Sequence, residues 1–212
     1  STPNVSNINW PNNSIDHFVL SELEKQKLSP SKKADKMTLL RRIHYDLTGL
    51  PPNSKEIDSF LSLEGSKIKA AIEEKIAELL QRKDFGIRWG RHWLDVARYA
   101  DSTGGGRTLL MNEAWRYRDY VIDSFNSDKP YNDFIREQIA GDLMASSSNE
   151  NKVERLISTG FLLLGPTNYE LQDKTILEMD IIDEQLDTIG KTFMGLTLGC
   201  ARCNDHKFDP IS

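Results

Sequence analysis

The sequence predicts an all-α fold, in the form of an irregular multi-helix domain with long loops. Apolar residues recur at helical spacing along most of the chain. There is no convincing run of alternating apolar and polar residues that would indicate a strand, and there is no internal repeat. The breaks between periodic segments are rich in Pro, Gly, Ser and Asn, which are typical of turns and helix ends.

The first half of the chain predicts an arm followed by five helices. Residues 1–13 are rich in Asn, Pro and Ser and predict an extended arm, with Trp10 as its anchor. Gly49 followed by Pro51 and Pro52 is a strong helix stop. From the periodicity and these breaks, helices are expected from residue 14, over 35–48, from residue 54, over 67–82 and over 85–100.

The second half predicts four more helices and ends in a loop that contains both cysteines. Three consecutive glycines at 104–106 predict a loop, because glycine loses much backbone entropy inside a helix. The Ser-rich stretch 145–151 predicts a surface loop. Helices are expected over 113–125, 132–144, 153–164 and 175–193. Gly195 and Gly199 then predict that the last helix ends and a Cys-x-x-Cys loop begins.

Composition limits the function classes. The chain has 212 residues, 28% of them charged, and a net charge of −5, which favours a domain with a solvated surface and argues against nucleic-acid binding. No apolar run approaches the roughly 20 residues that span a bilayer. The chain opens without Met and ends directly after its most ligand-rich stretch. We therefore expect 14–212 to be a single domain from a longer multidomain protein, with a C-terminal companion domain or other subunits as partners.

The stretch 199–210 concentrates more candidate ligands than any other. Cys200 and Cys203 are the only cysteines in the chain, and they are separated by two residues. Asp205, His206 and Asp209 follow directly. The pattern differs at one position from Cys-x-x-Cys-His, the attachment motif for c-type haem, because residue 204 is Asn.

Several segments resemble a bacterial family of domains of unknown function, the planctomycete cytochrome-like domains. The segments that carry the resemblance are residues 41–52, 91–101, 115–121, 138–143 and 195–210. The resemblance implies an exported protein of Planctomycetes or related bacteria, located in the periplasm or at the cell surface. It also implies a larger domain that follows this one, and in some members a haem-binding module that precedes it.

Three chemistries are open for the Cys-x-x-Cys stretch. Covalent haem is disfavoured, because Asn204 has no imidazole to serve as the iron ligand. A divalent metal is the second alternative: zinc on Cys200, Cys203 and His206 with Asp205 or Asp209, or calcium on carboxylates alone. A Cys200–Cys203 disulfide is the third, and an oxidising compartment favours it.

A candidate pocket is expected at Asp101, Asn168 and Glu170. Asp101 precedes the glycine-rich loop, where Gly104 to Gly106 would allow close backbone approach to a ligand, and Asn168 and Glu170 follow a Gly-Pro turn. The plainer interpretation is a helix end beside ordinary turns. No catalytic residue can be assigned.

Several charged and imidazole side chains predict structural roles. His44 and His92 are expected to be hydrogen-bonded packing residues, and the pair Asp183–Glu184 is expected to be solvated. Five arginines are expected to pair with nearby aspartates: Arg88, Arg91, Arg98, Arg116 and Arg118 with Asp95, Asp119, Asp123 and Asp142.

These observations favour a binding or structural module with a disulfide or metal site at Cys200 and Cys203. The first alternative is part of an extracellular hydrolytic or redox enzyme that acts on a polymer. In that alternative Asp101, Asn168, Asp205 and His206 would line a cleft shared with the companion domain. The second alternative is a scaffold subunit of a cell-surface assembly.

Overall fold

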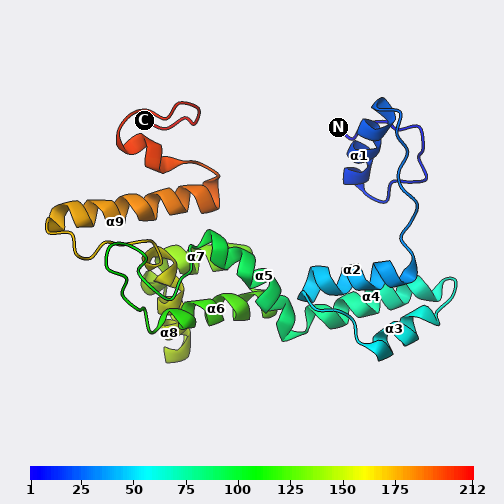
Figure 1. The fold of residues 1–212 in the computed structure, drawn as a ribbon, viewed down its shortest axis with the longest axis horizontal. Helices are drawn as coiled ribbons and strands as arrows, with labels where there is room; N and C mark the ends of the chain where they lie inside the picture. Colours follow the sequence, from blue (N-terminus) through cyan, green and yellow to red (C-terminus); the bar gives the residue numbers. More distant parts are fainter. The chain divides into compact units, whose positions relative to one another are not determined.

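The computed structural model describes all 212 residues and confirms the all-α fold class, with nine α-helices and no strand (Figure 1). Each predicted helix is present, with ends that differ from the expected ones by a few residues. The helices are α1 Ser14–Lys25, α2 Lys36–Thr48, α3 Ser54–Leu61, α4 Lys67–Leu80, α5 Lys83–Val96, α6 Ala114–Asn126, α7 Tyr131–Ala140, α8 Asn149–Ser158 and α9 Lys174–Ile189. No helix is both long enough and apolar enough to cross a bilayer.

The chain forms two compact units, Ser1–Leu39 and Leu40–Ser212, and the division falls within α2. In the first unit, the segment before α1 folds back on that helix. The backbone amides of Ser6 and Asn7 donate to the Glu24 carboxylate at 2.9 and 3.2 Å. The Asn13 side chain caps α1 by accepting from the amide of Asp16. Leu20 is the buried residue of this helix.

In the second unit, Glu56 connects α3 to α4. Asn53 and Glu56 form a capping box at the start of α3. The Glu56 carboxylate also accepts from Arg82 at 2.6 Å and from Lys75 at 3.3 Å. Burial opposes ionisation of Glu56, but the hydrogen bonds from the Asn53 amide, Arg82 and Lys75 outweigh it and lower its pKa to about 2. This carboxylate is therefore a structural anchor.

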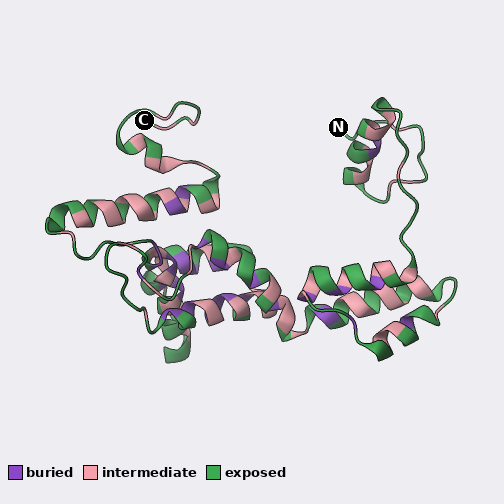
Figure 2. Ribbon diagram, in the orientation of Figure 1, coloured by how far each residue is buried: buried purple, intermediate pink, exposed green.

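The main hydrophobic core lies among α5, α6, α7 and the chain that follows α8. Figure 2 shows buried residues on these helices. A close approach of α5 to α6 needs glycine at position 86, where a Cβ would lie 2.5 Å from the carbonyl oxygen of Ile122. The core consists of Leu94, Ala97, Tyr117, Tyr120, Val121, Phe134, Phe161 and Leu164.

A hydrogen-bonded polar group lies inside this core. The indole N–H of Trp93 donates to the Tyr117 hydroxyl at 3.0 Å and to the Gln138 carbonyl oxygen at 2.9 Å. The Tyr117 hydroxyl also donates to Gln138. Burial raises the pKa of Tyr117 above its ordinary value, so the phenol stays protonated as a donor.

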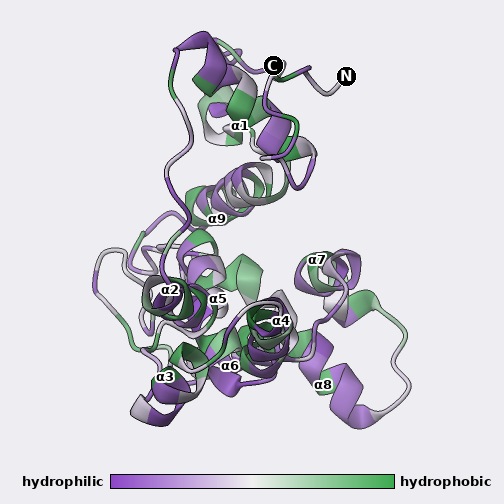
Figure 3. Cartoon of the chain, turned by 90° about the vertical axis from the view of Figure 1, so that its right-hand side faces the viewer, coloured by the Kyte–Doolittle hydropathy of each residue, from purple (hydrophilic) through white to green (hydrophobic).

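The α9 helix is attached to the core at one end and is exposed along much of one face. Arg98, just after α5, binds Glu184 at 2.7 Å. Ile189 and Phe193 pack against the core. Apolar residues also recur on the exposed side of α9. Figure 3, which views α9 nearly end-on, shows both hydrophobic and hydrophilic residues on this helix. The exposed apolar residues of α9 are Ile176, Met179, Ile182 and Leu186.

Candidate functional site

The Cys-x-x-Cys segment is a short helical turn, not the open loop that the sequence predicts. Gly195, with φ of 65°, ends the turn that follows α9. The chain then forms a 3₁₀ helix at Leu198–Arg202 that contains Cys200. Cys200 and Cys203 are both exposed, and both thiols are free.

Carboxylates on α9 hold this turn in place. The backbone amide of Gly199 donates to Asp187 at 2.7 Å. The Arg202 guanidinium binds Asp180 at 2.7 Å and Asp183 at 3.2 Å, and these contacts raise its pKa. Burial of Asp187 opposes ionisation, but the hydrogen bonds from Lys191 and Gly199 are stronger and lower its pKa. The positions before and after Cys200 are therefore anchored, and the thiols stay accessible.

His206 and Asp209 close the segment that follows. The Nδ1 atom of His206 accepts from the amides of Phe208 at 3.1 Å and Asp209 at 2.6 Å. The His206 amide donates to the carbonyl of Ile211 at 2.9 Å. The Asp209 carboxylate accepts from the amide of Thr197 at 3.1 Å. His206 and Asp209, two of the five side chains that the sequence marks as metal ligands, are thus engaged by backbone amides, and Asp205 is exposed.

The two hydrogen bonds to Nδ1 of His206 determine which ring nitrogen could bind a metal ion. Because Nδ1 accepts two N–H bonds, the ring proton resides on Nε2. A histidine that binds a metal through Nε2 donates a proton from Nδ1, which is the opposite arrangement. No group of three or more His, Cys, Asp and Glu side chains is placed to hold a metal ion. Nδ1 of His206 is occupied by backbone amides in this arrangement, and the metal and haem alternatives for the Cys-x-x-Cys stretch stay predictions.

Asp101 is exposed, and its carboxylate is engaged by a neighbouring hydroxyl. The Asp101 carboxylate accepts from the Tyr99 hydroxyl at 2.6 Å. Burial, and then this hydrogen bond, raise the pKa of Tyr99 to about 12. The glycine-rich loop packs against the Gly-Pro turn, where Thr167 donates to the carbonyl of Thr103 at 3.0 Å. A side chain at Gly106, which has φ of 54°, would collide with Asn168.

Asn168 lines a small hollow of about 180 Å³, and the residues that line it include Gly105 and Asp180. Neither Asp101 nor Glu170 is among the lining residues. Glu170 is exposed, and its amide donates to the side chain of Asn168 at 3.2 Å. The glycines thus serve close packing with Thr167 and Asn168, and a ligand site at Asp101, Asn168 and Glu170 stays a prediction.

Residues 14–212 match the family model PSCyt2, described as a protein of unknown function (DUF1549). The chain belongs to this family. The resemblance to the planctomycete cytochrome-like domains is thereby confirmed. No curated protein and no solved structure matches the chain. The match includes every candidate site residue. The description of PSCyt2 gives no activity, so the chemistry of these residues is the basis for a proposed function.

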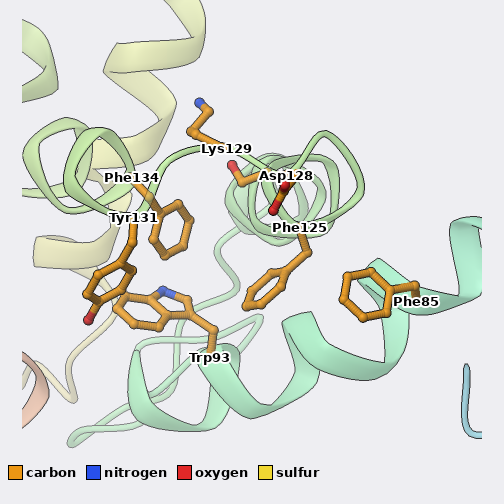
Figure 4. A pocket seen from close by; sticks show the side chains of 8 residues that line it. Phe85, Trp93, Phe125, Asp128, Lys129, Tyr131 and Phe134 are labelled. Atoms are coloured by element: carbon orange, nitrogen blue, oxygen red, sulfur yellow. The ribbon is translucent and has the colours of Figure 1, made fainter. Parts of the chain in front are cut away.

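The PSCyt2 domain also contains an aromatic pocket that the sequence does not reveal. It has a volume of about 370 Å³ and lies among α5, α6 and α7 (Figure 4). The residues that line it are Phe85, Trp93, Ser124, Phe125, Asp128, Lys129, Tyr131 and Phe134. The only signal in the sequence is the turn at 128–130 between two helices rich in aromatic residues, and such a turn is common in proteins without a pocket.

Proposed function

We propose that this PSCyt2 domain is an exported binding and structural module that presents Cys200 and Cys203 as a dithiol–disulfide pair. The observation that carries the proposal is the anchoring of the turn at Gly199 and Arg202, which leaves both thiols exposed. An anchored turn keeps the two side chains near each other, and closure of a small ring then costs little additional chain entropy.

The covalent step is an oxidation of two thiols. The two sulfur atoms join, two protons leave, and two electrons pass to an oxidant such as the disulfide of a thiol oxidoreductase. An extracytoplasmic compartment favours the disulfide form. Because the ring encloses only the residues between positions 200 and 203, the disulfide would stabilise the turn more than the whole domain.

In this proposal, the module binds a C-terminal companion domain or another subunit. Two observations support it: the cysteine turn and the apolar residues Ile176, Met179, Ile182 and Leu186 are all exposed. Apolar side chains aligned along one helix are typical of surfaces that a partner covers.

The redox proposal is tested on domain exported to a bacterial periplasm and purified without a metal-affinity column. We expect no free thiols before reduction, two after reduction, and zinc and iron well below one ion per chain. A Cys200→Ser, Cys203→Ser double variant should have the same helical content and show no thiols in either state. If the unaltered chain binds one zinc ion and the double variant binds none, the metal alternative is supported and the disulfide is contradicted.

A further inference from the structure

The aromatic pocket is built from three helices. Phe85 and Trp93 come from α5, Phe125 from α6, and Tyr131 and Phe134 from α7. Figure 4 shows the rings of Trp93, Tyr131 and Phe134 grouped on one side, with Phe125 and Phe85 on the other. The Trp93 and Phe134 ring centroids are 4.8 Å apart in an edge-on arrangement, and those of Phe125 and Phe134 are 6.2 Å apart. A small ligand in this pocket would therefore lie among aromatic side chains.

The pocket has one carboxylate that no other group engages. Asp128 follows α6 with φ of 50°, and its amide closes the end of that helix by donating to Phe125. Its carboxylate makes no hydrogen bond or ion pair within the chain. Figure 4 shows this carboxylate beside Phe125, at the edge of the ring cluster.

The neighbouring ammonium group of Lys129 is already neutralised. Its Nζ atom binds Glu137 at 2.5 Å and Glu154 at 2.8 Å, and it lies 4.6 Å from the Tyr120 ring centroid. Figure 4 shows it turned away from the rings. The Asp128 carboxylate is therefore the charge available to a ligand, and its sign is negative.

We propose that this pocket binds a small organic cation of the alkylammonium class. Aromatic faces attract a cation through the negative charge of their π systems, and several faces around a quaternary ammonium give a recurrent recognition geometry. Asp128 adds a unit of opposite charge at the edge. The cavity volume of about 370 Å³ suits a small molecule. An anion would lack a free partner, and a neutral apolar ligand would make no use of Asp128.

The direct test is a titration with choline and with its neutral isostere, 3,3-dimethyl-1-butanol, followed by the indole N–H signal of Trp93 in nitrogen-15 NMR spectra. We expect choline to bind with a dissociation constant on the order of 1 mM and the isostere to bind at least about fivefold more weakly. Equal shifts and affinities for the two compounds, or no saturable shift with choline, would overturn the proposal.

Two variants localise the site. Asp128→Asn keeps a residue that tolerates positive φ and removes only the charge, so we expect about a fivefold loss of choline affinity. Tyr131→Leu keeps an apolar side chain at a largely exposed position and removes one ring, with about a threefold loss. Asp123→Asn, an exposed and unpaired carboxylate on α6, is the control for charge and should change affinity less than twofold.

Far-UV circular dichroism verifies that each variant keeps its helices. If one of the two variants loses its helices, the other variant alone localises the site. If Asp128→Asn and Tyr131→Leu both bind choline as tightly as the unaltered chain, the cation does not occupy this pocket and the proposal is wrong. This test is independent of the cysteines, so its failure would leave the dithiol proposal intact.

Discussion

At the scale of single residues, the imidazole of His44 shows how far local sequence can predict a role. Its side chain is fully buried, as expected for a packing residue. The expected hydrogen bonds are absent, since neither ring nitrogen has a partner, and Glu56 lies 3.8 Å away. Burial lowers the pKa of His44, although the Glu56 charge acts in the opposite direction. Sequence predicts burial from periodicity, but hydrogen bonding depends on geometry between helices.

The arginines show the same limit. Arg91 pairs with Asp95, and Arg118 pairs with Asp119, as predicted from nearby positions. Arg98 instead binds Glu184, far along the chain, and Glu184 is partly buried there. Asp183, which is expected to be solvated, forms a partly exposed ion pair with Arg202. No local pattern identifies these long-range pairs.

The Glu56 carboxylate makes stability depend on pH. Its pKa is about 2 in the fold, below the ordinary value of 4.5, so the folded state binds fewer protons than the unfolded state between these values. Its stabilisation is therefore complete above pH 4.5 and is lost as the pH falls toward 2. We expect Glu56→Gln to lower the free energy of unfolding at pH 7 by about 2 kcal/mol, measured by urea denaturation.

The difference between Glu56→Gln and the unaltered chain should shrink as the pH falls through this window. Glu64→Gln, an exposed glutamate, is the matched control and should change stability by less than about 0.5 kcal/mol at any pH. A Glu56→Gln deficit that stays constant from pH 7 to pH 2.5 would contradict the assigned role.

At the scale of elements, helix positions are well predicted because their signals are local. The glycine and proline stop after α2 and the polar start of α3 are both visible in the sequence. The C-terminal turn is predicted less well. The sequence locates Cys200 and Cys203, but the α9 carboxylates that anchor the turn and the amides that occupy His206 depend on the path of the chain in space.

Arg202 tests the anchoring of the cysteine turn. Arg202→Ala removes two exposed ion pairs, so we expect the global free energy of unfolding to fall by less than about 1 kcal/mol. Amide hydrogen exchange over residues 199–211 should nevertheless accelerate, because the turn loses one of its attachments to α9. The measurement is hydrogen exchange with mass spectrometry.

Arg107→Ala is the control for this experiment, because Arg107 is exposed and unpaired. It should leave exchange over 199–211 unchanged. If Arg202→Ala also leaves it unchanged, the Gly199–Asp187 contact alone holds the turn and the role assigned to Arg202 is wrong.

At the scale of the whole molecule, stability is concentrated in the aromatic core of the second unit. Phe161 is fully buried against Trp93 and Phe193. We expect Phe161→Ala to lower the free energy of unfolding of this unit by about 3–5 kcal/mol, because it leaves a cavity. Phe208→Ala, at a position 83% exposed, should change it by less than about 0.5 kcal/mol. Equal effects of the two substitutions in urea denaturation would contradict this account of the core.

The division of the chain within α2 is not predicted from the sequence, in which 14–212 is expected to be one domain. Apolar periodicity continues through α2 without a break, so nothing local indicates the boundary. The family match likewise begins in the first unit and ends in the second. The single-domain assignment remains a prediction.

We propose that Cys200 and Cys203 form a dithiol–disulfide pair without a metal. The most direct test of this claim is the intact mass of the exported domain after alkylation under native conditions without reduction. We predict a chain that carries no alkyl group and lacks two hydrogen atoms, and that takes up two alkyl groups after reduction. A chain that is alkylated twice without reduction, or that retains zinc until it is denatured, would contradict the claim.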